Sequence, residues 1–340
     1  MKNPKKKRRN RRKSRISAIL IALVVVALLF GGYKIGRGLE TRHTQPEVRG
    51  EYQRYNTIYQ PTIEVDEATY RQRNDLTTIL LIGVDRESNA VSSGYRNGGQ
   101  VDFLDLLVID EEQKRISQLS IDRDTMTPIT VLGVLGNQTG VRTAQISLSH
   151  GFGDGGAQSC ELTVDAVSNL LLGTHIDKYI ALNMDGISVL NDAVGGVTVT
   201  LKDDFSALDP AMTPGTTLTL MGDQAEYYVR SRVNMSVGTN EARMERQREY
   251  VSQMTQQLKA RIQESKSFIN TIFDLLDSYL TTDMSRGLLL STVWNIRDYE
   301  NVQLELSGEH VVAADGFMEF YVDETDLQQK VLELFYQKVE

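Results

Sequence analysis

The stretch VDFLDLLVIDEEQKRISQLSID, residues 101–122, decides the fold class of this chain. Two apolar runs, VDFLDLLVID and RISQLSID, have the composition of β-strands, and the polar turn EEQK separates them. The pattern predicts a hairpin. Its second strand ends in IDRDT, where Asp122, Arg123 and Asp124 follow one another. A surface strand has no need of three consecutive charges, so they indicate a site that must hold both a cation and an anion.

Strands alternate with helices in the rest of the sequence. TTILLIGVD, residues 77–85, predicts another buried strand, and residues 155–173 predict a helix closed by Gly173. Further strands are predicted at 179–184, 197–201 and 302–306, and further helices at 184–196, from 222 toward 232, at 241–263 and at 326–338. We therefore expect an α/β domain over residues 77–340, a three-layer α/β/α arrangement with a central mixed sheet.

The N-terminal part has a different composition. Residues 1–15 carry ten Lys and Arg and no acid, and residues 16–33 are uncharged and almost wholly apolar. Eighteen helical residues rise about 27 Å, close to the ~30 Å hydrocarbon core of a bilayer. This favours an uncleaved transmembrane helix over 16–36 rather than a cleavable signal peptide, whose apolar core is ~7–15 residues long. The basic tail is then cytoplasmic, and the chain beyond a polar stalk at 37–76 is outside, as in a single-pass protein of the cell membrane.

Charge and cysteine content exclude several other functions. Subtracting the ten basic residues of the tail from 37 Lys and Arg leaves 27 against 45 Asp and Glu, a net charge of −18 for the remainder. So acidic a domain is a poor partner for nucleic acid. The single Cys160 lies in a helical pattern and is expected to be a buried structural thiol. The four histidines are scattered and predict no zinc site.

Two carboxylates are candidates for a metal site. Asp85 follows the strand at 77–85, and Asp102 lies at the start of the next strand. Mg²⁺ is commonly held by one or two carboxylates together with substrate phosphate and water. Each Asp, taken alone, also fits a residue that caps a turn. The spacing therefore supports an anion site outside the membrane, with Asp85 and Asp102 as possible ligands of Mg²⁺ or Mn²⁺.

Two arginine-containing segments are candidates for binding phosphate. Arg230 and Arg232 are two residues apart in YYVRSR, so an extended chain would present both guanidinium groups on one face, where they suit a diphosphate. Arg243, Arg246 and Gln247 share a face of the helix predicted at 241–263. A charged edge strand and a solvated helix face with local ion pairs are the alternatives for these two segments.

In this order the motifs resemble those of the LytR-CpsA-Psr (LCP) family of bacterial envelope proteins, with the resemblance covering residues 77–263. The matching segments are ILLIGVD (79–85), VDFLDLLVID (101–110), LSIDRDT (119–125), ISLSHGFGDGG (146–156), the run at 163–201, YVRSR (228–232) and RMERQREYV (243–251). The basic tail and single anchor also fit that family's layout. Residues 264–340 would supply further helices and a strand of the same domain.

The resemblance implies a phosphotransferase that uses Mg²⁺ and moves a glycopolymer from a polyprenyl-pyrophosphate carrier to a cell-wall acceptor, usually a peptidoglycan hydroxyl. The polyprenyl tail would lie in an apolar tunnel between sheet and helices. By position, Asp85 and Asp102 would hold the metal, with Asp102 also the general base, and Asp124 would orient Arg123. The phosphate-binding residues would be Arg123, Arg230, Arg232, Arg243 and Gln247.

The sequence departs from the family pattern at charged positions. The usual Arg-Ser-Asp-Thr is Gln100-Val101-Asp102-Phe103, the usual Lys-Ile-Asn is Gln145-Ile146-Ser147, the usual proline before the Arg-Asp pair is Asp122, and the usual Asp-x-Gly-Arg is Asn240-Glu241-Ala242-Arg243. Two cations are thus lost from an anion site. Arg96 and Arg142 lie a few residues upstream of the two losses and could replace them from loops.

These losses leave the function open between several classes. A transferase is favoured, a polyprenyl-phosphate-binding protein without catalytic activity is the main alternative, and a pyrophosphatase with water as acceptor is a third. Transcriptional regulation is disfavoured because the domain is placed outside the membrane and is acidic.

Overall fold

The computed structural model describes the chain from residue 62 onward, with gaps. The described residues are 62–65, 67–85, 98–231, 246, 249–250, 253–254, 256–258, 260–261, 264–265, 268–296 and 299–339. They fall into two compact units, which we call the sheet unit (described residues up to 183, 280–285 and 299–339) and the helical unit (184–279 and 286–298). The predicted basic tail, transmembrane helix and first part of the stalk lie outside the described residues. In the part that is described, no helix is both long and apolar enough to span a membrane.

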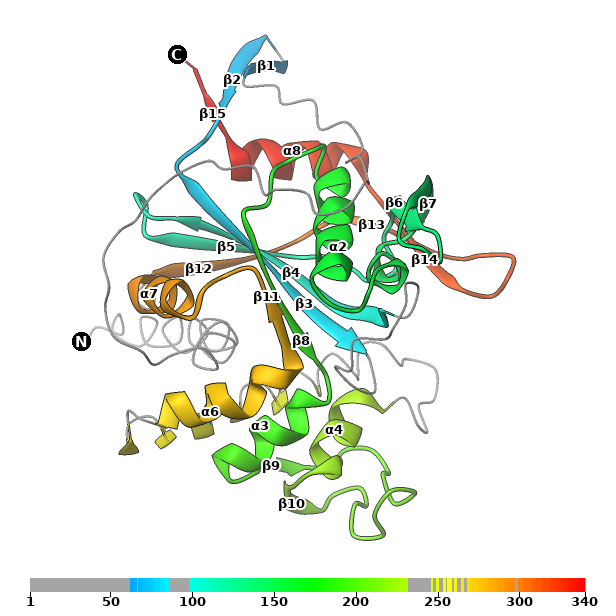
Figure 1. Ribbon diagram of the computed structural model, residues 1–340, viewed down its shortest axis with the longest axis vertical. Coiled ribbons are helices and arrows are strands. Elements are labelled where there is room, and N and C mark those ends of the chain that lie inside the picture. Colours follow the sequence, from blue (N-terminus) through cyan, green and yellow to red (C-terminus); the bar gives the residue numbers. More distant parts are fainter. Residues whose placement is uncertain are drawn as a thin grey trace, which may run out of the picture. The chain divides into compact units, whose positions relative to one another are not determined.

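The sheet unit is built on a six-stranded mixed sheet (Figure 1). Its strand order is β11 (Leu280–Thr282), β8 (Lys178–Asn183), β3 (Leu76–Asp85), β4 (Gln100–Asp110), β5 (Arg115–Ser120) and β12 (Glu300–Glu305). The predicted hairpin is confirmed, since β4 and β5 pair antiparallel, and Lys114 turns the chain with φ 50°. β8 runs parallel to β3 and β12 runs parallel to β5, so the sheet is mixed, as expected.

One face of this sheet carries the core of the unit. Leu80, Leu106 and Leu119 are level with one another across β3, β4 and β5, and each is fully buried. They cluster with Val167 of α2 (Ala157–Leu170) and Val331 of α8 (Glu324–Phe335). The mixed α/β class is therefore confirmed. A three-layer arrangement stays a prediction.

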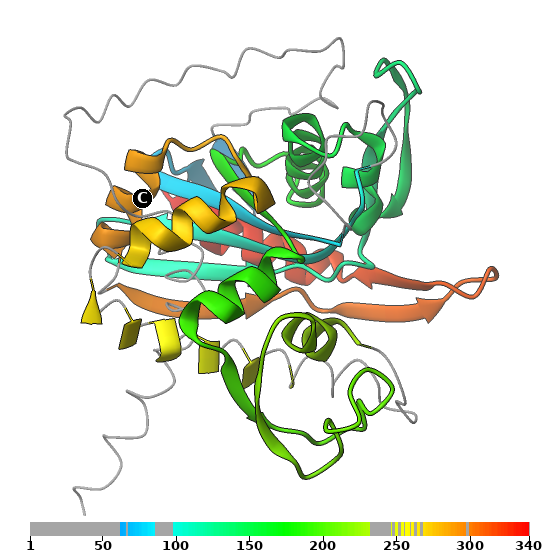
Figure 2. The ribbon, with the colours of Figure 1, turned by 60° about the horizontal axis from the view of Figure 1, so that its bottom comes forward.

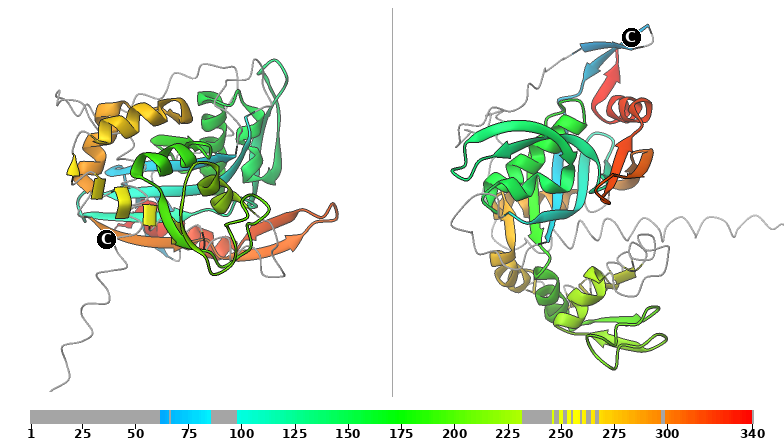
Figure 3. Two further views of the ribbon diagram at one scale, coloured as in Figure 1. Left: turned by 90° about the horizontal axis from the view of Figure 1, so that it is seen from below. Right: turned by 90° about the vertical axis from the view of Figure 1, so that its right-hand side faces the viewer.

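Smaller sheets surround the central one. β1 (Thr62–Val65), β2 (Ala68–Gln72) and β15 (Tyr336–Lys338) form a three-stranded sheet. Residues 62–72 were expected in the stalk, but their short polar alternation belongs to strands that pair with the end of the chain. Two hairpins, β6 (Met126–Leu132) with β7 (Gln138–Gln145) and β13 (Gly308–Val312) with β14 (Met318–Val322), were not predicted; they project as separate ribbons (Figure 3). Two 3₁₀ turns, η1 (Ile146–Leu148) and η2 (His150–Phe152), lead from β7 to α2.

The helical unit contains α3 (Gly186–Val194), β9 (Val197–Thr200), β10 (Thr217–Leu220), α4 (Asp223–Arg230), α6 (Phe268–Leu276), η3 (Asp277–Tyr279) and α7 (Arg286–Ile296). The predicted helix and strand at 184–201 are confirmed, and Gly195 ends α3 with φ 93°. One expectation is corrected: α4 runs through Arg230 and becomes extended only at Ser231, so Arg230 is not in a strand.

Candidate functional site

The charged turn at 121–125 lies where β5 ends beside the start of β4. Asp105 pairs with Ser120, and the Ile121 N–H donates to the Leu104 carbonyl at 3.0 Å. Continuing this antiparallel register to the sheet edge brings Asp102 opposite Arg123. The β4–β5 hairpin that the sequence predicts therefore brings two predicted site residues, Asp102 and Arg123, into contact.

A β-bulge helps to set the direction of Asp102. On β3, Gly83 is paired with Phe103 and Val84 with Val101, so Asp102 is the extra residue of β4. Bulges re-aim side chains and are common beside active sites. A Cβ on Gly83 would lie 2.9 Å from the Phe103 Cβ, closer than carbon atoms approach, so the backbones pack this tightly only because residue 83 is glycine.

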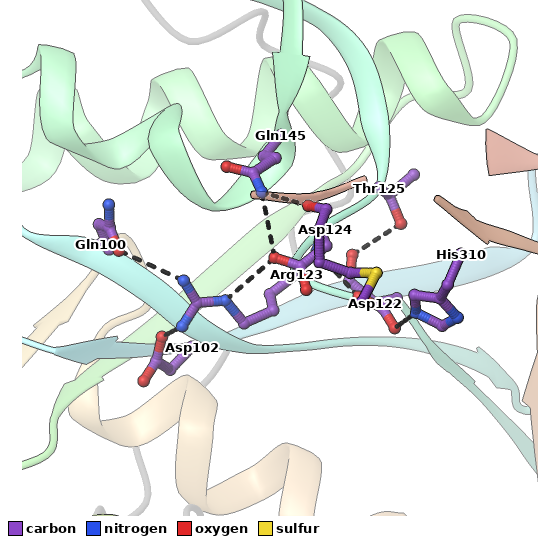
Figure 4. Close-up of polar contacts among 9 residues, drawn as sticks. Gln100, Asp102, Asp122, Arg123, Asp124, Thr125, Gln145 and His310 are labelled. Carbon is purple, nitrogen blue, oxygen red and sulfur yellow. Dashed lines mark hydrogen bonds and ion pairs between the residues drawn. The ribbon is translucent and has the colours of Figure 1, made fainter. Parts of the chain in front are cut away.

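Arg123 is the centre of the site (Figure 4). Its guanidinium forms an ion pair with Asp102 through Nη1, donates from Nη2 to Gln100 Oε1 at 3.3 Å, and approaches Asp124 Oδ1 at 3.5 Å from Nε. The side chain of Asp102 is only 7% exposed, whereas that of Arg123 is 24% exposed. The fork is thus fixed by three partners and still open to a ligand. A fixed, partly exposed guanidinium is suited to bidentate binding of a phosphate.

The residues flanking Arg123 are held by their own hydrogen bonds. The Asp122 side chain accepts from the Asp124 N–H at 2.8 Å, and its carbonyl accepts from the Thr125 N–H at 3.1 Å and the Thr125 hydroxyl at 2.6 Å. His310 of β13 contacts the other carboxylate oxygen of Asp122 at 2.9 Å. Asp122 is therefore part of the site's framework, and His310 is a contributor that the sequence did not single out.

The two glutamines that stand at family cation positions lie in the site. Gln100 accepts from Arg123, and Gln145 Nε2 donates to Asp124 Oδ1 at 3.4 Å and to the Met318 carbonyl at 2.5 Å. Both supply hydrogen bonds but no charge. Arg142, proposed as a replacement cation from a loop, is instead in β7 with its guanidinium 5.1 Å from the centroid of the Phe152 ring.

The candidate metal ligands share one face of the sheet. Asp85 is directly opposite Gln100 in the β3–β4 register, and cross-strand partners point to the same side. Gln100 and Asp102 both bind Arg123, and the register places Asp85 beside the first of them. Among the described residues no three Asp, Glu, His or Cys gather as a metal site. Two carboxylates nevertheless match the usual Mg²⁺ set, in which substrate phosphate and water complete the coordination.

The remaining predicted residues stay predictions. Arg96, Arg232, Arg243 and Gln247 lie outside the described residues, and for Arg230 only the backbone is described. Arg246, which the sequence places on the same helix face as Arg243 and Gln247, is buried in the helical unit. Arg246 forms an ion pair with Asp203 at 2.8 Å and donates to the Ser231 carbonyl at 2.5 Å, immediately after Arg230.

One further carboxylate of β4 has an unusual environment. Asp105 is buried and accepts hydrogen bonds from Gln118 and, at 2.6 Å, from the Ser120 hydroxyl. Burial raises the pKa of Asp105 to about 6, and the two hydrogen bonds partly oppose this shift. Sequence reasoning missed this group, because a single acid within an apolar strand resembles a solvent-facing residue.

The sequence and the fold are similar to those of known proteins. A teichoic acid transferase of Halalkalibacterium halodurans, named polyisoprenyl-teichoic acid–peptidoglycan teichoic acid transferase TagU, is 28% identical over 303 residues, covering 85% of this chain and 89% of its own length. The crystal structure of protein gbs0355 from Streptococcus agalactiae matches with a TM-score of 0.58 at 24% identity, over 76% of this chain and 87% of that one. The structure described as TagT bound to LI-WTA matches with a TM-score of 0.54 at 22% identity, over 77% and 90%.

These two structural matches support the fold. The model of the LytR_cpsA_psr family matches residues 44–335, a span that includes every described residue of the Arg123 site. Motif order, sheet and family model agree, and this chain belongs to the LytR_cpsA_psr family.

Proposed function

We propose that this chain is a transferase that moves a glycopolymer, of the teichoic acid type, from a polyprenyl-pyrophosphate carrier to peptidoglycan. The observation that carries the proposal is the partly exposed guanidinium of Arg123, which Asp102, Gln100 and Asp124 hold where β4 begins and β5 ends. The name of the Halalkalibacterium halodurans relative, a teichoic acid transferase, supports the substrate class. We further propose that a helix at 16–36 anchors the chain in the cell membrane, with the sheet unit outside.

The residues of the site have separate tasks in this reaction. Arg123 would bind the pyrophosphate and stabilise the charge that develops on its oxygens, because its donors are already oriented. Asp124 would hold the guanidinium in that orientation, and Asp102 would accept the proton of the acceptor hydroxyl. Asp85 and Asp102 would hold Mg²⁺ or Mn²⁺, which when bound neutralises phosphate charge. Arg96, Arg230, Arg232, Arg243 and Gln247 are proposed further phosphate-binding residues.

The test is glycan transfer by the full-length chain in detergent micelles with a polyprenyl-pyrophosphate-linked glycan, Mg²⁺ and peptidoglycan. Glycan should become bound to peptidoglycan, and Arg123→Ala should lower the rate by about 10²–10³-fold, the usual loss for one electrostatic donor. Arg115→Ala is the matched control. It removes an arginine from β5, whose partner Glu333 is 3.8 Å away at an exposed position.

A non-catalytic lipid carrier or sensor is the second candidate. The observation in its favour is that Gln100 and Gln145 supply no positive charge where the family pattern has cations. Binding of the lipid without transfer or cleavage of its pyrophosphate would support this candidate and contradict the transferase. Hydrolysis of the carrier to polyprenyl phosphate and glycan phosphate, without an acceptor, would instead identify a pyrophosphatase.

A further inference from the structure

The C-terminal hairpin, β13 with β14, contacts the turn that carries Arg123. The Phe320 N–H donates to the Asp124 carbonyl at 2.8 Å, and Phe320 forms a parallel bridge with Thr125. Figure 2 shows β12 leading into this hairpin, which extends beyond the sheet. The turn is therefore joined by backbone hydrogen bonding to a segment almost 200 residues later in the chain.

His310 adds a side-chain contact to Asp122, the residue that precedes Arg123. Its Nε2 lies 2.9 Å from Asp122 Oδ2, while Asp122 Oδ1 accepts the Asp124 N–H at 2.8 Å. The imidazole also packs on the Phe320 ring, with centroids 4.6 Å apart. A single carboxylate thus connects the imidazole of the hairpin with the backbone of the turn.

Gln145 makes a third connection. Its Nε2 donates to the Met318 carbonyl of β14 at 2.5 Å and to Asp124 Oδ1 at 3.4 Å. Asp124 in turn faces the Nε of Arg123. The residues before and after Arg123 are both tied to the hairpin, by contacts that do not use the guanidinium.

We propose that the C-terminal hairpin positions the Arg123 guanidinium for its anionic ligand, and that His310 is a positioning residue acting through Asp122. The assignment of a ligand rests on the proposed function, but the positioning itself does not. The proposed positioning also explains why Asp122 stands where the family pattern has proline. The Asp122 carboxylate can bind His310, which a proline side chain cannot do. The side chains of His310 and Asp122 are 45% and 32% exposed, so solvent screens their interaction. We therefore expect the pair to affect the orientation of Arg123 rather than the stability of the fold.

The first test measures positioning without any ligand. In the full-length chain, His310→Ala should speed amide hydrogen exchange at Asp124 and Thr125 by about two- to fivefold, the range of an exposed ion pair. His310→Gln, which keeps an N–H donor, should restore part of the protection. His175→Ala is the matched control, because His175 lies 3.7 Å from Asp177 in another exposed pair of the sheet unit. Unchanged exchange in His310→Ala would overturn the proposal.

The second test uses geranylgeranyl pyrophosphate as a probe for the anion. His310→Ala should weaken its binding by about two- to fivefold in the wild-type background. The same substitution should have no further effect when Asp122 or Arg123 is already alanine, because His310 acts through them. Equal weakening in the Arg123→Ala background would contradict the proposal. If the wild-type chain fails to bind the probe, the ligand assignment falls, and the exchange measurement still decides whether the hairpin positions the turn.

Discussion

Arg123 and Asp102 lie 21 residues apart in the sequence and form an ion pair at the edge of the central sheet. The antiparallel register of β4 and β5 brings their backbones together, and a bulge at Asp102 sets the direction of the carboxylate. Because Asp102 is nearly buried and Arg123 is not, the pair has one anchored member and one that a ligand can reach.

Removing the charge of Asp102 should impair function more than folding. Asp102→Asn keeps the shape of the side chain but weakens the hold on Arg123 and removes the proposed proton acceptor. We expect the transfer rate to fall by about 10²-fold or more. The measurement is glycan transfer to peptidoglycan, with Glu111→Gln in the exposed turn after β4 as control. A rate within about twofold of wild type would show that Asp102 is not a catalytic residue.

Gly83 should tolerate no side chain. Gly83→Ala would place a Cβ 2.9 Å from the Phe103 Cβ, next to the bulge, and such overpacking costs about 1–3 kcal/mol. The free energy of urea unfolding should fall by this amount, and Arg123-dependent ligand binding should weaken as Asp102 shifts. Gly140→Ala on β7 is the control, because a Cβ there meets nothing within 4 Å. Equal stability of the two variants would show that the bulge adapts easily.

Asp105 should make stability depend on pH. Burial raises its pKa to about 6, so the native state keeps the proton that the unfolded chain releases near pH 4. This contribution is fully present below about pH 4 and is lost as pH rises through about 6, a total of about 3 kcal/mol. Asp105→Asn should therefore stabilise the protein above about pH 7.

The side chain of Gln118 can bind the amide that Asp105→Asn introduces. Gln118 Oε1 is buried and has no hydrogen-bond partner in the described part of the chain, and a flipped Gln118 amide could accept from the new side-chain N–H at position 105. Urea unfolding of both proteins between about pH 4 and pH 8 is the measurement. A difference between them that does not change with pH would show that Asp105 does not titrate differently on folding.

Arg246 should be needed for the stability of the helical unit. It is buried, pairs with Asp203, and lies 5.2 Å from the ring centroid of Phe205 and 5.7 Å from that of Tyr228. Arg246→Ala should cost about 1–3 kcal/mol, since it removes the hydrogen bond to the Ser231 carbonyl and opens the packing of both rings.

Arg286→Ala is the control for this change. Arg286 pairs with Asp274 at 2.9 Å, but Arg286 is only partly buried and Asp274 is exposed, so we expect a loss below about 1 kcal/mol. Thermal or urea unfolding measures both variants. A similar, small loss in the two would mean that burial adds nothing to the Arg246 contacts.

Several elements could be predicted because their signals are local. The strands at Leu76–Asp85, Gln100–Asp110 and Arg115–Ser120 and the helix at Ala157–Leu170 follow from hydrophobic periodicity and turn residues, which neighbouring residues determine. The hairpins at 126–145 and 308–322 were missed. In β7, β13 and β14 few residues are buried, so their hydrophobic alternation is weak.

The sequence by itself determined the family and the β4–β5 hairpin, because both follow from motif order and local hydrophobic pattern. It also identified Asp102, Arg123 and Asp124 as candidate site residues. Only the tertiary structure decided that Arg123 is held by Asp102 and Gln100, and that His310, 188 residues away, binds Asp122. The physical reason is register: which side chains meet across a sheet depends on strand pairing, bulges and core burial, and these are fixed only when distant segments pack together.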